Sequence, residues 1–157
     1  MGSVVIRLGG IVMNLKMSDA YNLTRFVEAQ DPVYDQVCWE LEEGRKLTHW
    51  IWFMFPQISG LSSSVTSIKF AIVSLDEASQ YLDHPVLGPH LRHCTELVCK
   101  IQNRSAKQIL GMTDAVKFRS CMTLFAHATT DNALFVSALN KYFDGQYDSL
   151  TLEIIKS

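Results

Sequence analysis

The stretch that decides the fold covers residues 88–128 and reads GPHLRHCTELVCKIQNRSAKQILGMTDAVKFRSCMTLFAHA. The apolar residues of its first expected helix recur three or four positions apart, at Leu91, Cys94, Val98 and Ile101. Ser105 and Gln108 have the spacing of a capping box, which opens a second helix. Thr113 is expected to cap a third. The buried stripe of that helix consists of Ala115, Phe118, Met122 and Phe125. Three consecutive amphipathic helices predict an all-α fold.

Outward from this stretch, similar helix-start signals recur toward both ends of the chain. A polar or acidic residue precedes each expected helix, in one case with proline at the first helical position and in another with glutamate three residues later. These signals lie at Asn22, Asp31-Pro32, Ser74 with Glu77, Asp131 and Asp148. The pattern predicts a compact multihelical array of about seven or eight helices.

In two stretches the sequence pattern does not decide between a helix and a strand. Residues 47–55 are apolar on every side, so periodicity does not distinguish a buried helix from a buried strand, and Pro56 ends the run either way. Residues 67–73 alternate in the manner of a short strand, with their large apolar residues at Ile68, Phe70 and Ile72. We therefore expect at most one short extended segment, near residues 67–73.

Residues 1–17 stand apart from this pattern. They show no helical period, and Gly9 and Gly10 interrupt their apolar run. They also lack the basic start and the small-residue cleavage site of a signal peptide. We expect residues 1–17 to be a poorly packed N-terminal extension and residues 18–157 to form a single helical domain.

Composition argues against several classes of function. The 157 residues are 48% hydrophobic and 19% charged, which is not the composition of a disordered chain. The formal net charge is −2, so the chain is not basic enough to form a nucleic-acid-binding face. No run reaches the roughly 18 apolar residues of a membrane span. The four cysteines form no C-x-x-C pair, which is typical of reduced thiols. We expect a cytoplasmic protein with no nucleic-acid or membrane partner, while its oligomeric state stays open.

The densest group of binding side chains lies in residues 44–57. Arg45 and Lys46 offer cations for a phosphate or carboxylate, and an indole such as that of Trp52 can stack on a planar group. We expect six ligand-binding residues: Arg45, Lys46, His49, Trp52, Gln57 and Arg119. The alternative is that both cations are solvated while His49 and the tryptophans belong to the core.

The helix expected after Thr113 carries a second polar stretch. Its residues are Val116, Ser120, Thr123 and His127, with Arg119 beside them. Ser120 and His127 are two helical turns apart, about 10 Å, which is too far for a hydrogen bond between a nucleophile and its base. This face is therefore a candidate for binding, not for a hydrolytic serine.

Metal and cofactor motifs are not evident. His90 can share one helix face with either His93 or Cys94. Such a pair supplies two ligands, which is fewer than a zinc site needs. The chain has no G-x-x-x-x-G-K-[ST], G-x-G-x-x-G or H-E-x-x-H sequence. We expect no metal and no cofactor, and whether the chain is an enzyme stays open.

The run HWIWFMFPQ at residues 49–57 gives the chain a family resemblance. It resembles the bacterial and fungal family catalogued as domain of unknown function 1810, whose members are sometimes labelled calpastatin. Further similar stretches are LTRFVEAQ at 23–30, SLDEASQYLDHPVLGPHL at 74–91 and KFRSCMTLF at 117–125. The resemblance spans residues 18–155 and implies a compact, mainly helical fold of cytoplasmic bacterial origin. It supplies no demonstrated catalytic residue.

Two features qualify what the resemblance implies. The calpastatin label implies protease inhibition, yet disordered inhibitors are rich in charge and this chain is lean in it. Phe70 and Cys121 stand where relatives often have Tyr and Ser, so an activity that needs those hydroxyls would be weakened here.

Two functional interpretations compete. In the first, a basic and aromatic pocket binds or acts on an anionic, nucleotide-like metabolite. In the second, the same surface is a non-enzymatic protein–protein interaction module. A polar-lined cleft at residues 44–57 would favour the first interpretation, and a flat exposed tryptophan patch would favour the second.

Overall fold

The computed structural model describes the backbone of residues 2–8 and 11–17, and backbone with side chains in residues 19–157. Outside the N-terminal strands the structure is 64% helical, which confirms the expected all-α array. The helices are α1 Thr24–Gln30, α2 Tyr34–Glu42, α3 Ile51–Met54, α4 Val65–Lys69, α5 Leu75–Asp83, α6 Leu87–Lys100, α7 Ala106–Leu110, α8 Met112–Ala128, α9 Ala133–Phe143 and α10 Ser149–Lys156. Seven of these ten have at least seven residues. The other three, α3, α4 and α7, are too short to show a helical period in the sequence.

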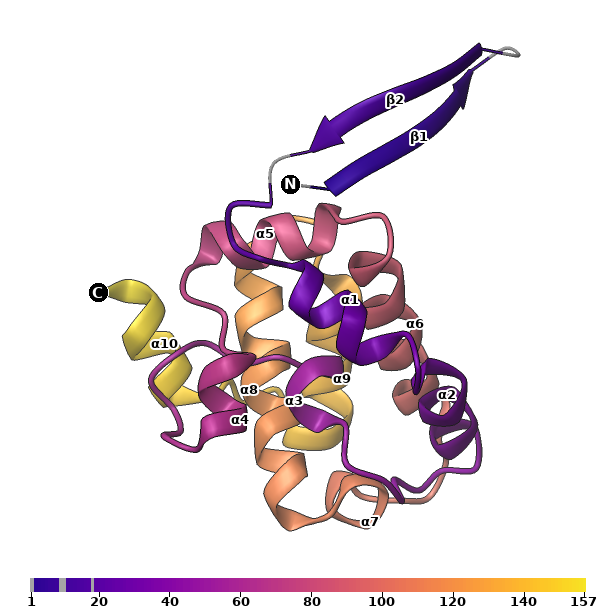
Figure 1. Ribbon diagram of the computed structural model, residues 1–157. Helices are drawn as coiled ribbons and strands as arrows, with labels where there is room; N and C mark the ends of the chain where they lie inside the picture. The colour runs from indigo at the N-terminus through magenta and orange to yellow at the C-terminus, as the bar shows by residue number, and fades with distance from the viewer. Residues whose placement is uncertain (1, 9–10, 18) are drawn as a thin grey trace.

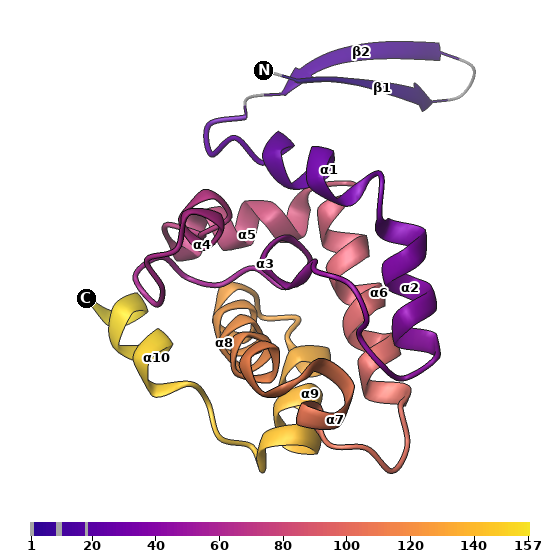
Figure 2. The same ribbon diagram turned by 60° about the horizontal axis from the view of Figure 1, so that its bottom comes forward.

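Helix α8 forms the centre of the array, and the other helices are arranged around it (Figures 1 and 2). It contacts α3, α5, α7, α9 and α10. Phe118, Met122 and Phe125 of the expected stripe are fully buried. Phe118 packs edge-on against Phe55 with 4.9 Å between ring centroids, and Tyr81 lies 5.3 Å from Phe125. Each such aromatic side chain contributes about 1.5–3 kcal/mol by leaving water, so α8 organises the core.

Three of the predicted caps act as the sequence indicates. The side chains of Ser74, Ser105 and Asp148 each accept a hydrogen bond from the backbone N–H three residues later, at the starts of α5, α7 and α10. Ser105 and Gln108 form the reciprocal capping box. These bonds satisfy N–H groups that the first helical turn leaves unpaired.

The predicted cap of α1 is wrong. Asn22 adopts a left-handed conformation with φ 53° in the turn before the helix. Asp19 supplies the acceptor instead, since its carboxylate accepts the N–H groups of Leu23 and Thr24. A carboxylate at a helix N-terminus also interacts favourably with the helix dipole.

No regular strand forms in residues 67–73, because α4 includes residues 67–69. Ile72 alone pairs, in an isolated parallel bridge with Ile58. The Ile72 N–H donates to the Gln57 carbonyl at 2.8 Å, and the Ser59 N–H donates to the Ile72 carbonyl at 2.7 Å. This bridge anchors the segment that carries Gln57.

Two strands precede the helices, β1 (Gly2–Leu8) and β2 (Ile11–Met17), and they pair antiparallel. Figure 1 shows them projecting from the helical array. The sequence signal for this hairpin is a pair of glycines between two apolar runs. The expectation that residues 1–17 pack weakly concerns side chains that lie outside the described residues.

None of the helices in residues 19–157 is both long enough and apolar enough to cross a membrane.

Candidate functional site

The loop between α2 and α3 is held from inside by a single buried carboxylate, that of Glu40. It accepts hydrogen bonds from the N–H groups of Leu47 and Thr48 at 2.6 and 2.9 Å, and from the Thr48 hydroxyl at 2.6 Å. The indole N–H of Trp50 donates to it at 3.0 Å. Burial opposes ionisation of Glu40, but these hydrogen bonds outweigh burial and lower its pKa to about 2. The carboxylate therefore stays charged and fixes the loop.

Lys46, one of the two cations expected to bind a ligand, is engaged within the protein. Its ammonium group lies 2.8 Å from the Asp114 carboxylate and donates to the Thr48 carbonyl at 2.6 Å. Only 7% of its side chain is exposed, and its Nζ lies 5.0 Å from the centroid of the Trp50 ring. Lys46 thus ties the loop to the first turn of α8.

Arg45 and His49 are exposed, and they are not brought together with Lys46. Arg45 lines a surface hollow with Asn103, Arg104 and Gln108, which we call the Arg45 hollow. None of the hydrogen bonds and ion pairs found in residues 19–157 involves the side chain of His49.

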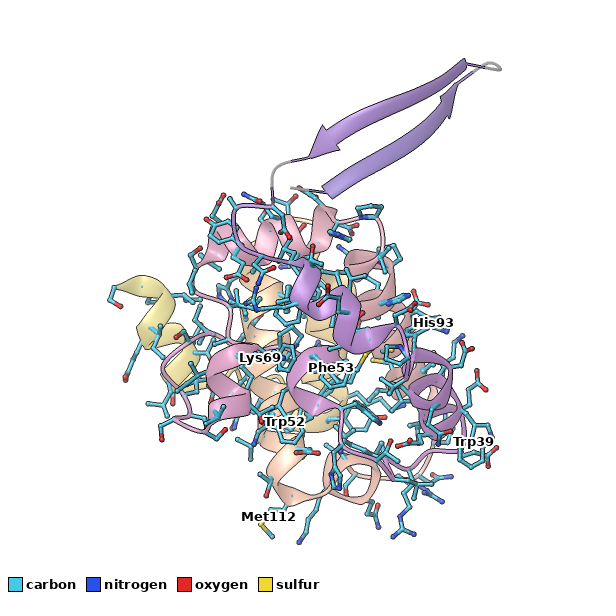
Figure 3. The ribbon with its side chains drawn as sticks, in the orientation of Figure 1. Trp39, Trp52, Phe53, Lys69, His93 and Met112 are labelled. Atoms are coloured by element: carbon cyan, nitrogen blue, oxygen red, sulfur yellow. The ribbon has the colours of Figure 1, made fainter. Side chains whose placement is uncertain are left out.

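The two tryptophans of the expected site separate into different environments. Trp50 is 1% exposed and belongs to the core. Trp52 is a residue of α3 and is half-buried, on the face shown in Figure 3. It lines a narrow slot, which we call the Trp52 slot, with Gln57, Ile58, Gly60, Leu61, Ser62, Ser67, Phe70 and Ala71. The slot has a free volume of about 10 Å³, room for about one water molecule.

A wider groove adjoins this slot and is lined by residues of α8 and of the start of α10. Figure 1 shows the positions of these two helices. We call the groove the Gln57 groove, and its volume is about 260 Å³. Its lining residues are Gln57, Leu61, Ser62, Thr113, Val116, Lys117, Ser120, Asp148 and Leu150. Slot and groove share Gln57, Leu61 and Ser62, so these three residues form their common wall. The groove therefore lies between Gln57, the last residue of the cluster predicted at residues 44–57, and the polar face of α8.

Lys117 is the cation of the Gln57 groove, and it is not one of the six residues that the sequence predicts to bind a ligand. Its side chain is half-buried, and within residues 19–157 its ammonium group has neither a hydrogen-bond acceptor nor an ion-pair partner. The side-chain amide of Gln57 is also without a hydrogen bond in that part of the chain. The signal in the sequence is spacing, because Lys117 lies three residues before Ser120 and therefore shares its helix face.

Arg119 does not line the groove, but it fixes the segment before α10, which forms one side of the groove. Its guanidinium group donates to the carbonyls of Gln146 and Tyr147 at 2.9 and 3.0 Å. The Thr123 hydroxyl, one turn later on α8, accepts the N–H of Asp148 at 2.9 Å. These bonds fasten the segment before α10 to α8, which places Asp148 at the groove.

The remaining polar groups of the α8 face are bound to their own helix. The Ser120 hydroxyl donates to the Val116 carbonyl at 3.1 Å, and the His127 Nδ1 lies 2.8 Å from the Thr123 carbonyl. Ser120 and His127 make no contact with each other that would support nucleophilic catalysis.

The histidines and cysteines of α2 and α6 form a separate cluster. The Tyr34 ring stacks on His90 at 3.6 Å between centroids, and His90 bonds to the Gln30 amide at 2.8 Å. Hydrogen bonds from Cys94 and Tyr34 lower the pKa of Cys38 to about 6. Among residues 19–157, no three His, Cys, Asp or Glu side chains are grouped as a metal site requires.

Phe70 and Cys121, the positions at which relatives are expected to carry hydroxyl groups, are both buried. Phe70 lines the Trp52 slot and is 7% exposed, whereas Cys121 belongs to the buried face of α8 and lies in the core. Only Phe70 stands at a hollow, so a hydroxyl missing there would affect the slot, and one missing at Cys121 would not.

Comparison with known proteins gives one family. The family described as "Protein of unknown function (DUF1810)" matches residues 20–155. A solved structure, that of the conserved hypothetical protein Rv1873 from Mycobacterium tuberculosis, is 48% identical to this chain, with a TM-score of 0.88. The match covers 88% of this chain and 99% of that chain. A search of curated proteins found no match. The chain therefore belongs to the family of proteins of unknown function called DUF1810.

Proposed function

We propose that this chain binds a small anionic metabolite in the Gln57 groove, with the Lys117 ammonium group and the Gln57 amide as its recognition groups. The observation that carries the proposal is that both groups line one groove while neither is bound to another part of the described chain. The ammonium group reaches solvent, since no buried side-chain nitrogen or oxygen atom in residues 19–157 lacks a hydrogen bond, and it stands without the negative counter-charge that an ion pair would give it. A carboxylate or phosphate supplies that charge and accepts from both donors.

The rest of the lining suits the carbon skeleton of such a ligand. Leu61, Val116 and Leu150 give the groove an apolar wall, and Ser62 and Thr113 add hydroxyl groups at its rim. The volume of about 260 Å³ is near the lower end of ligand pockets and suits a small metabolite.

Asp148 also lines the groove, but one oxygen of its carboxylate is already hydrogen-bonded within the protein. It caps α10 by accepting from the N–H and the hydroxyl of Thr151. The carboxylate therefore holds α10 in place but keeps its negative charge, so an anionic ligand would bind beside Lys117 and away from Asp148.

A nucleotide-like ligand would use the aromatic wall as well. Trp52 lies on the other side of the wall formed by Gln57, Leu61 and Ser62. The slot is too narrow for a base as it stands, so stacking on Trp52 requires Leu61 and Ser62 to move. Nucleotides and sugar phosphates are the ligands to compare first.

Replacing the groove cation tests the proposal. A thermal-shift screen of nucleotides, sugar phosphates and small carboxylic acids identifies the ligand, since a ligand at 100 times its dissociation constant stabilises by about 2.7 kcal/mol. Lys117→Ala should weaken its binding by about tenfold or more, because a hydrogen bond to a charged group contributes about 1.5–3 kcal/mol. The free energy of unfolding should change by less than about 1 kcal/mol, because the ammonium group has no ion pair to lose.

The matched control is Lys100→Ala, which removes an exposed lysine at the end of α6. Affinity for the ligand should be unchanged in this variant when measured by isothermal titration calorimetry. The proposal fails if no anion in the screen binds, or if the ligand binds Lys117→Ala as tightly as it binds the unmodified chain.

A second candidate function is a protein–protein interaction through the same face. It is favoured by the apolar rim of the groove, where Val116 and Leu150 are each 58% exposed. Met112, at the first turn of α8, is 65% exposed and lies at the end of that helix in Figure 3. Met112→Ser should leave the affinity for a small ligand unchanged, because Met112 is not among the residues that line the groove, but it should weaken binding of a protein partner. That contrast separates the two functions.

A further inference from the structure

We infer that the Arg45 hollow is a second anion site, which binds a phosphate or pyrophosphate group. It shares no lining residue with the Gln57 groove, and it lies between the loop after α2 and the loop before α7. Its lining consists of Arg45, Asn103, Arg104 and Gln108, around a volume of about 390 Å³.

The hollow is formed by groups that the protein holds in place. The Arg104 guanidinium donates to the Gly44 carbonyl at 3.0 Å, which sets it beside Arg45. Gly44 has a φ of +81°, a conformation that residues with a side chain rarely adopt, and it allows the chain to turn here. Arg104 is therefore oriented before any ligand arrives.

Gln108 is oriented in the same way. Its side-chain oxygen accepts the Ser105 N–H at 2.8 Å in the capping box of α7. This bond occupies the amide oxygen and leaves the two N–H donors of the amide for the hollow. Asn103, held in a left-handed conformation with φ 59°, places a second amide group on the lining.

The charge of the hollow is uncompensated. No carboxylate is among its lining residues. The ion pairs of residues 19–157 are Arg25–Glu77, Lys46–Asp114 and Arg92–Asp131, so neither Arg45 nor Arg104 takes part in one. Two neighbouring guanidinium groups repel each other, and an anion that binds both removes the repulsion.

The lining also selects the kind of anion. Two guanidinium groups and amide N–H donors match the several oxygens of a phosphate, and two positive charges match a dianion. No aromatic or aliphatic side chain lines the hollow. The recognised part of the ligand is therefore the phosphate group itself, whether it belongs to a free metabolite or to a phosphorylated side chain.

The test is titration calorimetry with pyrophosphate and with O-phosphoserine, at low salt, on the full chain. Arg45→Gln should weaken binding of the preferred probe by about tenfold, and the double variant Arg45→Gln, Arg104→Gln should weaken it further. Arg45 makes no side-chain hydrogen bond or ion pair with the described chain, so Arg45→Gln should keep the melting temperature. Tighter binding of pyrophosphate indicates a free metabolite, and tighter binding of O-phosphoserine indicates a phosphorylated side chain.

The matched control is Lys156→Ala, which removes an exposed lysine of α10 that lines neither the Gln57 groove nor the Arg45 hollow. It should bind the preferred probe as the unmodified chain does. The inference is overturned if the probe binds no more tightly than acetate, if the double arginine variant binds it unchanged, or if Lys117→Ala abolishes its binding. In the last case the anion occupies the groove, and the proposed function stands without the second site.

Discussion

Glu40 is the acceptor for an entire loop. Its two carboxylate oxygens receive the N–H groups of Leu47 and Thr48, the Thr48 hydroxyl and the Trp50 indole N–H. Gln36, one turn earlier on α2, adds a donor at 3.1 Å. Each donor would be left unsatisfied if the carboxylate were removed, and an unsatisfied buried group costs about 1–3 kcal/mol.

Glu40→Gln should therefore destabilise the chain by about 3 kcal/mol, because an amide offers one acceptor oxygen where the carboxylate offers two. Denaturant unfolding at neutral pH measures the change. Glu96→Gln is the control, because Glu96 is exposed on α6 and should cost less than about 0.5 kcal/mol. An equal effect of the two substitutions would contradict the role given to Glu40.

The same carboxylate predicts how stability depends on pH. Its pKa is lowered from 4.5 in the unfolded chain to about 2 in the folded one, so its contribution is complete above pH 4.5 and is lost as the pH falls toward 2. Below pH 4.5, the stability of the unmodified chain should therefore fall more steeply than that of Glu40→Gln.

At the scale of elements, α5 and α6 meet at a glycine. A Cβ atom placed on Gly88 would lie 2.0 Å from the Leu82 carbonyl oxygen, which belongs to backbone and cannot move aside. The first turn of α6 therefore contacts the last turn of α5 through a bare backbone. This glycine follows the sequence HPVL at residues 84–87. The close approach of the α5 and α6 backbones explains why the position is a glycine.

Gly88→Ala should destabilise the chain by about 3 kcal/mol, because relieving the overlap requires α5 and α6 to separate. Gly111→Ala is the control. A Cβ at Gly111 meets no atom within 4 Å, so this variant suffers only the backbone strain of φ +86° and ψ 161°, about 1–3 kcal/mol. Thermal unfolding of both variants measures the difference. If Gly111→Ala is the more destabilising, the contact between α5 and α6 is looser than the structure shows.

Helix positions could be predicted because their signals are local. A cap such as Ser74 or Ser105 acts on a residue three positions away, and a buried stripe repeats within one helix. The candidate site could not be predicted as well, because the Gln57 groove combines residues from 57 to 150 that meet only after packing.

Lys117 and Arg119 show how packing gives two cations on α8 different surroundings. They are two residues apart, so they point about 200° from each other around the helix. Arg119 donates to the carbonyls before α10, while Lys117 faces the groove. Residue type favours Arg119 as the anion ligand, but the packing of α10 against α8 decides which of the two is free.

For the molecule as a whole, the segment from Arg45 to Gln57 connects two separate hollows. Arg45 lines the hollow at one end of this segment, and Gln57 lines the groove at the other. Between them the Lys46–Asp114 ion pair fixes the segment to α8. A cluster that is continuous in sequence is therefore divided in space, and the two proposed sites share no lining residue.

The Glu40 network also determines how this surface loop exchanges its amide hydrogens with solvent. Leu47 is 55% exposed, and an amide at such a position normally exchanges quickly. The N–H groups of Leu47 and Thr48 instead point inward to a buried carboxylate, and releasing one of them disturbs the bonds of the others. Hydrogen–deuterium exchange should therefore show these two amides protected about as strongly as those in the middle of α8, and Glu40→Gln should remove the protection. Fast exchange in the unmodified chain would mean that the loop opens on its own, whereas slow exchange would make residues 47 and 48 kinetically part of the core although both residues are exposed at the surface.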